Sequence, residues 1–176
     1  TVDRIGSIVK ALKTFARDSQ HDALTPHNFQ QIAADTLNMC KERLRNHGAK
    51  LVYDEATANL LLDCRPTEIS QVLLNLLNNS LDAIETLDEK WIKLECVVVN
   101  EEVQIIVTDS GPGIPAAVAA KIMQPFFTTK DIGKGTGLGL SISRSIADAH
   151  GGKLELEAGA SNTKFVLKLP ALKEAA

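Results

Sequence analysis

The chain has 176 residues, of which 44% are hydrophobic and 23% charged, and its net charge is −3. These values are those of one well-buried globular domain with a short appendage. The chain contains no basic block and no apolar run near the ~18 residues that span a bilayer, so we expect no nucleic acid partner and no membrane contact by this segment. Its three cysteines are far apart, which predicts free thiols in a reducing compartment.

Residues 3–17 are predicted to form a helix, because apolar residues recur at i, i+3, i+4 and i+7. Residues 18–27 read as a connector, and a second helix is expected over about 28–46. Short strands are predicted at 49–53 and 59–63, joined by a polar turn. Pro66 then opens a third helix that extends to about Glu85.

The second half of the chain alternates strands and helices. Strands are predicted at 92–99 and 103–108 with a hairpin turn at 100–102, followed by a short helix at 115–123. Residues 123–136 have little periodicity and predict a mobile loop. A helix over 138–150 and a last hairpin, 153–157 with 163–169, complete the pattern. The fold class predicted is α+β, a two-layer α/β sandwich with a mostly antiparallel sheet and helices on one face.

The stretch from Gly133 to Ser141 reads Gly-Lys-Gly-Thr-Gly-Leu-Gly-Leu-Ser and runs directly into the helical pattern. Glycine lets a backbone approach a ligand closely, and a helix start presents unpaired N–H groups to an anion. Upstream, Asn75 and Asn79 lie four residues apart, so they share one face of the third helix. An amide oxygen suits Mg²⁺ that also holds phosphate oxygens. Together these features predict a phosphate site.

Four segments in this order resemble the N, G1, F and G2 boxes of the Bergerat-fold ATP-binding domain: 68–84, 109–115, 125–130 and 133–141. The residues of these segments are most similar to those of the catalytic domain of bacterial two-component sensor histidine kinases, and the resemblance covers about residues 26–170. It implies an ATP-binding domain at 26–172. Residues 1–25 resemble the end of the dimerisation domain and a linker, and the chain, which starts without Met, reads as an excised fragment.

The resemblance also implies the roles of single residues. Asn79 is the Mg²⁺ ligand, and Asn79 and Lys130 are the catalytic residues. Asp109 accepts a hydrogen bond from the adenine amine and so selects ATP over GTP, with Thr163 beside it, although Asn162 stands where the family usually has glycine. The implied ATP-binding residues are Asn75, Asn79, Asp82, Asp109, Gly111, Gly113, Ile114, Phe127, Thr128, Thr129, Lys130, Lys134, Gly135, Thr136, Gly137, Leu138, Gly139, Leu140 and Thr163.

The implied cofactors are ATP and Mg²⁺, and the implied activity is transfer of the γ-phosphoryl group to a histidine. None of His21, His27, His47 and His150 stands in the context of a phosphoacceptor histidine. The expected partners are therefore a histidine-bearing dimerisation domain of the same protein and a cognate response regulator. A homodimeric parent and a cytoplasmic location follow from the same resemblance.

Other functions stay open at this point. The Bergerat fold also serves ATPases such as type II topoisomerase subunits, mismatch-repair proteins and ninety-kilodalton chaperones, and it serves anti-sigma serine kinases. A regulatory module that binds nucleotide without turnover is a further alternative. The chain has no Walker A spacing, no kinase HRD or DFG element and no Rossmann frame around its glycines.

Overall fold

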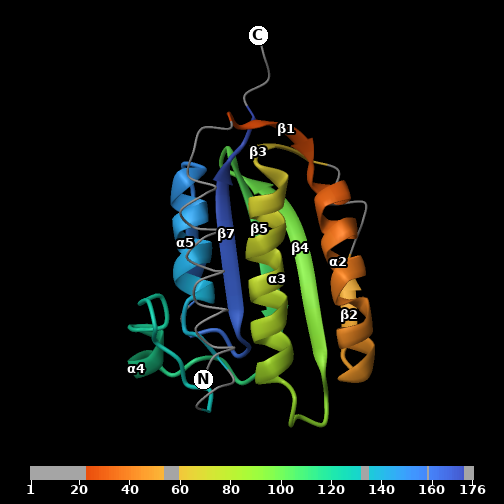
Figure 1. Ribbon diagram of the computed structural model, residues 1–176, viewed down its shortest axis with the longest axis vertical. Helices are drawn as coiled ribbons and strands as arrows, with labels where there is room; N and C mark the ends of the chain where they lie inside the picture. The colour runs from red at the N-terminus through yellow and green to blue at the C-terminus, as the bar shows by residue number, and fades with distance from the viewer. Residues whose placement is uncertain (1–22, 54–59, 132–134, 158, 173–176) are drawn as a thin grey trace, which may run out of the picture.

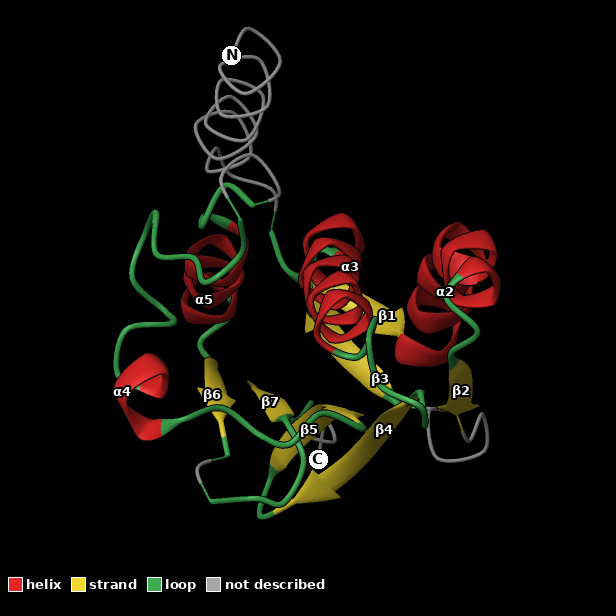
Figure 2. Cartoon of the chain, turned by 90° about the horizontal axis from the view of Figure 1, so that it is seen from below, coloured by secondary structure: helices red, strands yellow, loops and turns green. Residues whose placement is uncertain are grey.

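The computed structural model describes residues 23–53, 60–131, 135–157 and 159–172. They form two layers, with α2, α3 and α5 side by side over one face of a five-stranded sheet (Figures 1 and 2). This arrangement confirms the predicted α+β sandwich. The helix predicted at 3–17, and with it most of the proposed N-terminal segment 1–25, lies outside the described residues.

The five-stranded sheet has the order β2-β4-β5-β7-β6. Its strands are β2 (Lys50–Tyr53), β4 (Trp91–Val99), β5 (Glu102–Asp109), β7 (Lys164–Pro170) and β6 (Lys153–Leu156). Only the β2–β4 pairing is parallel, and the other three pairings are antiparallel. The turn between β4 and β5 places Asn100 and Glu101 at positive φ, as a tight hairpin requires.

A second, small sheet corrects two predictions. Residues predicted as connector contain β1 (Thr25–Asn28), which pairs antiparallel with β3 (Leu61–Cys64). The predicted neighbours 49–53 and 59–63 therefore lie in different sheets, as β2 and β3. Their alternation predicts strands correctly but carries no information on the partner, because each partner is distant in sequence.

The helices are α2 (Phe29–Asn46), α3 (Pro66–Ala83), α4 (Ala116–Ala119) and α5 (Gly139–Ala149). Asn28 caps α2, since its side-chain oxygen accepts a hydrogen bond from the Gln30 N–H at 2.8 Å. The helix predicted at 115–123 is shorter in the structure. Residues after Ala119 continue as turns, with Gln124 N–H donating to the Lys121 carbonyl.

Helix α3 occupies the middle of the helical layer and supplies much of the core. Its apolar residues Ile69, Val72, Leu73, Leu76, Leu77 and Leu81 are completely buried. Because these residues fill one side of the helix, the polar residues at 75, 79 and 82 are left half-buried on another side. The core packing of α3 therefore fixes the direction in which its asparagines point.

All three cysteines are free and buried. Burial raises the pKa of the Cys96 thiol to about 12 and, with the neighbouring charge of Asp63, that of Cys64 to about 11. They are structural side chains rather than reactive ones. Among the described helices, none is long and apolar enough to cross a membrane.

Candidate functional site

A cavity of about 620 Å³ lies at the lower end of the molecule as drawn in Figure 1, where α3, α5 and the α4 segment approach the sheet. Its volume is typical of small-molecule sites. It gathers most of the residues predicted from sequence, which come from the four separate segments. Those in its wall are Asn75, Asn79, Asp82, Asp109, Gly111, Gly113, Ile114, Phe127, Thr128, Thr129, Lys130, Gly135, Thr136, Gly137, Gly139, Leu140 and Thr163.

Two predicted residues are not seen in this wall. Leu138 is buried just before α5, and Lys134 lies outside the described residues. The wall also contains residues that were not predicted from the sequence: Ser80, Ala83, Pro112, Pro115, Val118, Ile122 and Phe165. Two signals could have found some of them. Val118 and Ile122 have helical spacing, and Phe165 follows Thr163 by two residues in the strand predicted at 163–169, so that strand would place both on one face.

Asp109 is a buried carboxylate at the end of β5, with 2% of its surface exposed. Burial raises the pKa of Asp109, while hydrogen bonds from Ser80, from the Gly111 N–H and from Thr163 act in the opposite direction. The bond from Gly111 measures 2.9 Å. A carboxylate in a dry wall is held in a fixed direction and can accept a hydrogen bond from a ligand in the cavity.

Gly111 leaves space at this carboxylate that another residue would fill. A Cβ atom at Gly111 would lie 2.7 Å from Oδ1 of Asp109 and 3.1 Å from the hydroxyl of Thr163. The strands hold these groups together, because Asp109 N–H donates to the Thr163 carbonyl at 3.0 Å and Thr163 N–H donates to the Gly111 carbonyl at 3.3 Å. Asn162, which replaces the usual glycine, also donates to the Gly111 carbonyl at 3.3 Å.

Asn75 connects α3 to the beginning of α5. Its amide nitrogen donates to the Gly139 carbonyl and to the Ser143 hydroxyl, both at 3.0 Å. These bonds fix the first turn of α5 beside the cavity. No side chain caps this turn at Leu138, so its backbone N–H groups are available to an anion.

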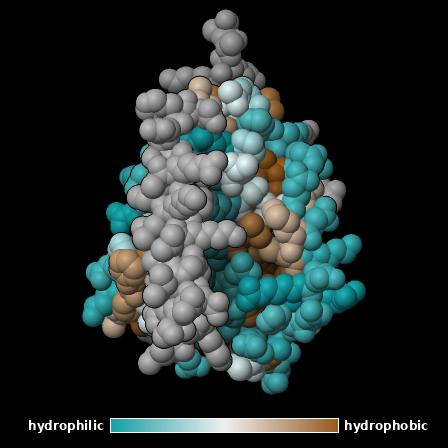
Figure 3. Space-filling model, viewed as in Figure 1, coloured by the Kyte–Doolittle hydropathy of each residue, from teal (hydrophilic) through white to brown (hydrophobic). Residues whose placement is uncertain are grey.

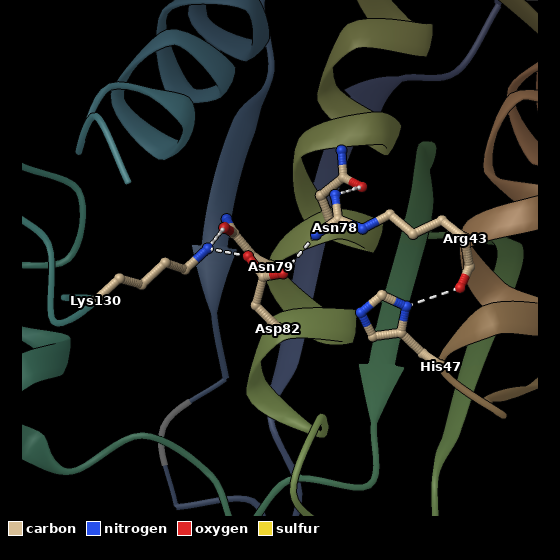
Figure 4. Close-up of polar contacts among 6 residues, drawn as sticks. All are labelled: Arg43, His47, Asn78, Asn79, Asp82 and Lys130. Atoms are coloured by element: carbon tan, nitrogen blue, oxygen red, sulfur yellow. Dashed lines mark hydrogen bonds and ion pairs between the residues drawn. The ribbon is translucent and has the colours of Figure 1, made fainter. Parts of the chain in front are cut away.

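Asn79 and Asp82 of α3 and Lys130, which points toward them, form a polar cluster in the cavity wall (Figure 4). The Lys130 ammonium donates to Oδ1 of Asn79 at 3.1 Å and to Oδ2 of Asp82 at 2.5 Å. Arg43, from α2, binds the other oxygen of Asp82 at 2.6 Å. The Lys130 ammonium thus occupies the side-chain oxygen of Asn79, the residue predicted from the sequence to bind Mg²⁺.

The α4–α5 segment, the residues between the end of α4 at Ala119 and the start of α5 at Gly139, contains two adjacent phenylalanines that differ in burial. Phe127 is half-buried and lines the cavity, whereas Phe126 is 64% exposed and adopts a positive φ of 66°. Figure 3 shows a mostly hydrophilic face with small apolar patches, one of them at the lower left over the α4 segment. Neither phenylalanine belongs to the hydrophobic core of the described residues.

Comparison with known proteins agrees with this geometry. The model of the family of histidine kinase-, DNA gyrase B- and HSP90-like ATPases matches residues 64–173, and this chain belongs to that family. Within the family it is a catalytic ATPase domain of the sensor histidine kinase type. It is 33% identical over 167 residues to the C4-dicarboxylate transport sensor protein DctB of Rhizobium meliloti (strain 1021). That match covers 95% of this chain but only 26% of the sensor protein.

Solved structures show the same relationship. The catalytic domain of histidine kinase ThkA is 33% identical and superimposes with a TM-score of 0.75, covering 85% of this chain and 97% of that domain. ThkA in complex with the response regulator protein TrrA is similar over 97% of this chain and 49% of the kinase chain, with 27% identity and a TM-score of 0.76.

Proposed function

We propose that this chain binds Mg·ATP in the cavity and supplies the catalytic half of histidine autophosphorylation in a two-component sensor. The observation that carries the proposal is the pairing of a buried, fixed carboxylate, Asp109, with a cation-binding cluster of Asn79 and Lys130 in one cavity. The first suits a base with an exocyclic amine, and the second suits a phosphate chain with its metal. Family membership supports the ATP part of this assignment.

The adenine base would lie against Asp109 and Thr163. The Asp109 carboxylate would accept a hydrogen bond from the exocyclic amine, and Gly111 leaves room for the base to approach. Apolar wall residues would cover the faces of the ring, among them Ile114, Phe127 and Leu140, with Gly113 in the adjoining loop. An apolar slot with one oriented polar group is the usual design of a site for a purine base.

The phosphates would lie at the first turn of α5. The first turn of α5 has no side-chain cap, so its backbone N–H groups are available to phosphate oxygens, and Asn75 holds the turn in place. The other residues of this part of the wall are Gly135, Thr136, Gly137, Gly139 and Leu140, with Thr128 and Thr129. Lys130 would place its charge on the γ-phosphate. The role of Lys134 stays a prediction from the sequence.

The donor set of the cluster fits Mg²⁺. An amide oxygen on Asn79 and a carboxylate oxygen on Asp82 are hard ligands of the type that Mg²⁺ takes together with phosphate oxygens and water. The Lys130 ammonium on both oxygens supports this fit, since it is a cation at the same place. When bound, Mg²⁺ neutralises phosphate charge. This chain's part is to position the nucleotide and to add the Lys130 charge.

The acceptor would be a histidine on a dimerisation domain of the same protein, with a homodimeric parent and residues 1–25 as the connection. The bond between the γ-phosphorus and the bridging oxygen of ADP breaks, and a phosphorus–nitrogen bond to the imidazole forms. A response regulator would then receive the phosphoryl group. The complex of the related kinase ThkA with TrrA supports a regulator of that kind as partner.

Replacing Asn79 with alanine is expected to remove most of the benefit that Mg²⁺ gives to ATP binding. In the native chain, calorimetric titration with ATP should give a clearly higher affinity with Mg²⁺ than with EDTA. In Asn79→Ala the difference should fall by about tenfold, the equivalent of about 1.4 kcal/mol. Binding measured in EDTA should change little, because adenine contacts are untouched.

Asn38→Ala is the matched control, since Asn38 is an exposed asparagine on α2, away from the cavity. It should keep the native Mg²⁺ effect. An unchanged Mg²⁺ effect in Asn79→Ala would remove the metal assignment. Failure of the native chain to bind ATP under any condition would remove the proposed function itself.

The described histidines are not expected to accept the phosphoryl group. His150 is buried, its Nδ1 lies 2.7 Å from the Ile146 carbonyl, and its Nε2 accepts from the Arg65 N–H at 3.1 Å. Both ring nitrogens are therefore in use. With γ-labelled ATP, the chain should give acid-labile label on an added dimerisation domain that carries a phosphoacceptor histidine, and not on itself. Stable histidine label on this chain alone would contradict the proposal.

A further inference from the structure

The Lys130 ammonium bridges two oxygens of one helix. It contacts Oδ1 of Asn79 at 3.1 Å and Oδ2 of Asp82 at 2.5 Å, and these residues lie three apart on α3 (Figure 4). The side chains of Lys130 and Asp82 are 32% and 30% exposed, so solvent still reaches the pair from the cavity. The contact joins the segment between α4 and α5 to α3 across about fifty residues of sequence.

The two oxygens are ligands for which an ammonium and a divalent cation compete. An amide oxygen and a carboxylate oxygen on adjacent turns suit a hard cation, and an ammonium satisfies them with two of its three donors. Both cations cannot occupy the same oxygens, since two positive charges at that separation repel each other strongly outside bulk water. The lysine must leave before a metal can bind there.

Arg43 holds Asp82 in place from the other side. Its Nη2 lies 2.6 Å from Oδ1 of Asp82, and its Nη1 donates to Oδ1 of Asn78 at 2.7 Å. Arg43 belongs to α2 and reaches Asp82 from the side opposite Lys130 (Figure 4). If Lys130 departs, the Asp82 carboxylate therefore keeps one partner and its direction. Arg43 acts as a positioning residue, and Lys130 is the exchangeable cation.

We propose that Lys130 occupies the cation position of the site when no nucleotide is bound. A divalent cation then takes its place on Asn79 and Asp82, and the ammonium moves to the terminal phosphate of the nucleotide. This inference rests on the proposed function for its second half, and it makes Lys130 the competitor of the metal for the oxygens of Asn79 and Asp82. Metal alone binds weakly, because it must displace Lys130 and leave that charge without an anion.

The exchange couples metal and nucleotide. The terminal phosphate offers the displaced ammonium a new anionic partner, so nucleotide lowers the cost of metal binding. By thermodynamic linkage, metal raises nucleotide affinity by the same factor. Metal binding therefore breaks the contact of Lys130 with α3, and only when nucleotide is also present does the ammonium gain a new anionic partner.

The test uses Mn²⁺ without nucleotide and follows its binding by electron paramagnetic resonance and by broadening of backbone amide NMR signals. Lys130→Gln should bind Mn²⁺ about tenfold more tightly than the native chain, a change equivalent to about 1.4 kcal/mol. The broadening should centre on Asn79 and Asp82. Because a half-buried ion pair contributes little to stability, this variant should fold normally.

Two further variants distinguish an effect at the cation site from an effect of overall charge on Mn²⁺ binding. Lys121→Gln removes a positive charge from an exposed lysine of the same segment, which is not in the cavity wall, and should leave Mn²⁺ affinity unchanged. Adding Asp82→Asn to Lys130→Gln should abolish the gain. A gain that survives Asp82→Asn, or an equal affinity in Lys130→Gln and the native chain, would overturn the proposal.

The same variants report on the coupling. In the native chain, a nucleotide should raise Mn²⁺ affinity by a larger factor than in Lys130→Gln, because in the variant no lysine has to be displaced. Equal factors would overturn the exchange. If the native chain binds ATP with Mg²⁺ but Lys130→Gln shows no gain for metal alone, only this inference fails. If the native chain binds no ATP, the proposed function fails, and the measurement with metal alone still decides the cation position.

Discussion

Asp109→Asn is expected to lower the affinity for ATP by about 10²-fold or more, a loss of about 2.7 kcal/mol in binding free energy. The native carboxylate is buried and fixed by the Gly111 N–H, Ser80 and Thr163, so it presents only acceptor oxygens to the cavity. An amide must turn either its nitrogen or its oxygen toward the base. Whichever way it turns, a donor of the site or of adenine loses its acceptor in a dry environment.

The same variant should also lose discrimination between nucleotides. Guanine presents a carbonyl oxygen where adenine presents its amine, and two acceptors facing each other repel. The native chain is therefore expected to bind ATP and not GTP. In Asp109→Asn the ratio of the two affinities should fall toward one, because an amide can serve either base. Calorimetric titration of both proteins with both nucleotides measures this ratio.

Loss of stability should not explain the loss of binding. Burial raises the pKa of Asp109, which means that folding disfavours its ionised form relative to the unfolded chain. This penalty is present above the folded pKa and disappears as the pH falls below it. The neutral amide carries no such penalty, which offsets the loss of an accepted hydrogen bond, so the melting temperature of Asp109→Asn at neutral pH should stay close to that of the native chain.

Asp148→Asn is the matched control, because Asp148 is exposed on α5. It should keep both the affinity and the selectivity of the native chain. Native affinity in Asp109→Asn would remove the adenine role of this residue. A lowered melting temperature in Asp109→Asn would show that its carboxylate is needed for the fold instead.

Sequence patterns predicted the elements of this fold better than their partners. The helical spacing of apolar residues in α3 and the Val- and Ile-rich sequences of β4 and β5 are local signals. The bounds predicted for these three elements agree with the structure to within one or two residues. The pairing of β1 with β3, and of β2 with β4, depends on contacts between distant segments. Four-residue strands carry too little pattern to specify such partners.

The site shows a similar division. The resemblance to known motifs selected residues that the structure gathers around one cavity, but it gave no contacts between these residues. Asn75 is occupied with Gly139 and Ser143, and Asp82 is held by Arg43 as well as Lys130. Arg43 lies in α2, which none of the four motifs includes. Its contact with Asp82 depends on how α2 packs on α3, so the motifs could not predict it.

Gly137→Ala is the second change with a large expected effect, because Gly137 lies where two backbones cross. Its φ is +68°, and its carbonyl accepts a hydrogen bond from the Phe126 N–H at 2.8 Å. A Cβ atom there would lie 2.5 Å from the carbonyl carbon and 2.7 Å from the carbonyl oxygen of Phe126. Both are backbone atoms, so a change of rotamer cannot relieve the overlap, and one of the two segments must move.

That movement should lower the affinity for ATP. The segment at Gly137 leads directly into the first turn of α5, where the proposed phosphate site uses backbone N–H groups. A displacement of about 1 Å in such a site can cost about 10²-fold, and we expect a loss of ATP affinity of that size. Global stability should fall by less than for a change in the core, because the segment lies at the surface and can shift locally.

Gly48→Ala separates backbone strain from overlap. Gly48 has nearly the same φ, +64°, but nothing lies within 4 Å of its added Cβ. It should lose about 1 kcal/mol of unfolding free energy from the left-handed conformation alone, with no change in ATP affinity. Urea unfolding and calorimetry on both variants measure the two quantities. If Gly137→Ala bound ATP as Gly48→Ala does, the crossing at Phe126 would not control the phosphate site, and the loop would have to bind phosphate in a different conformation.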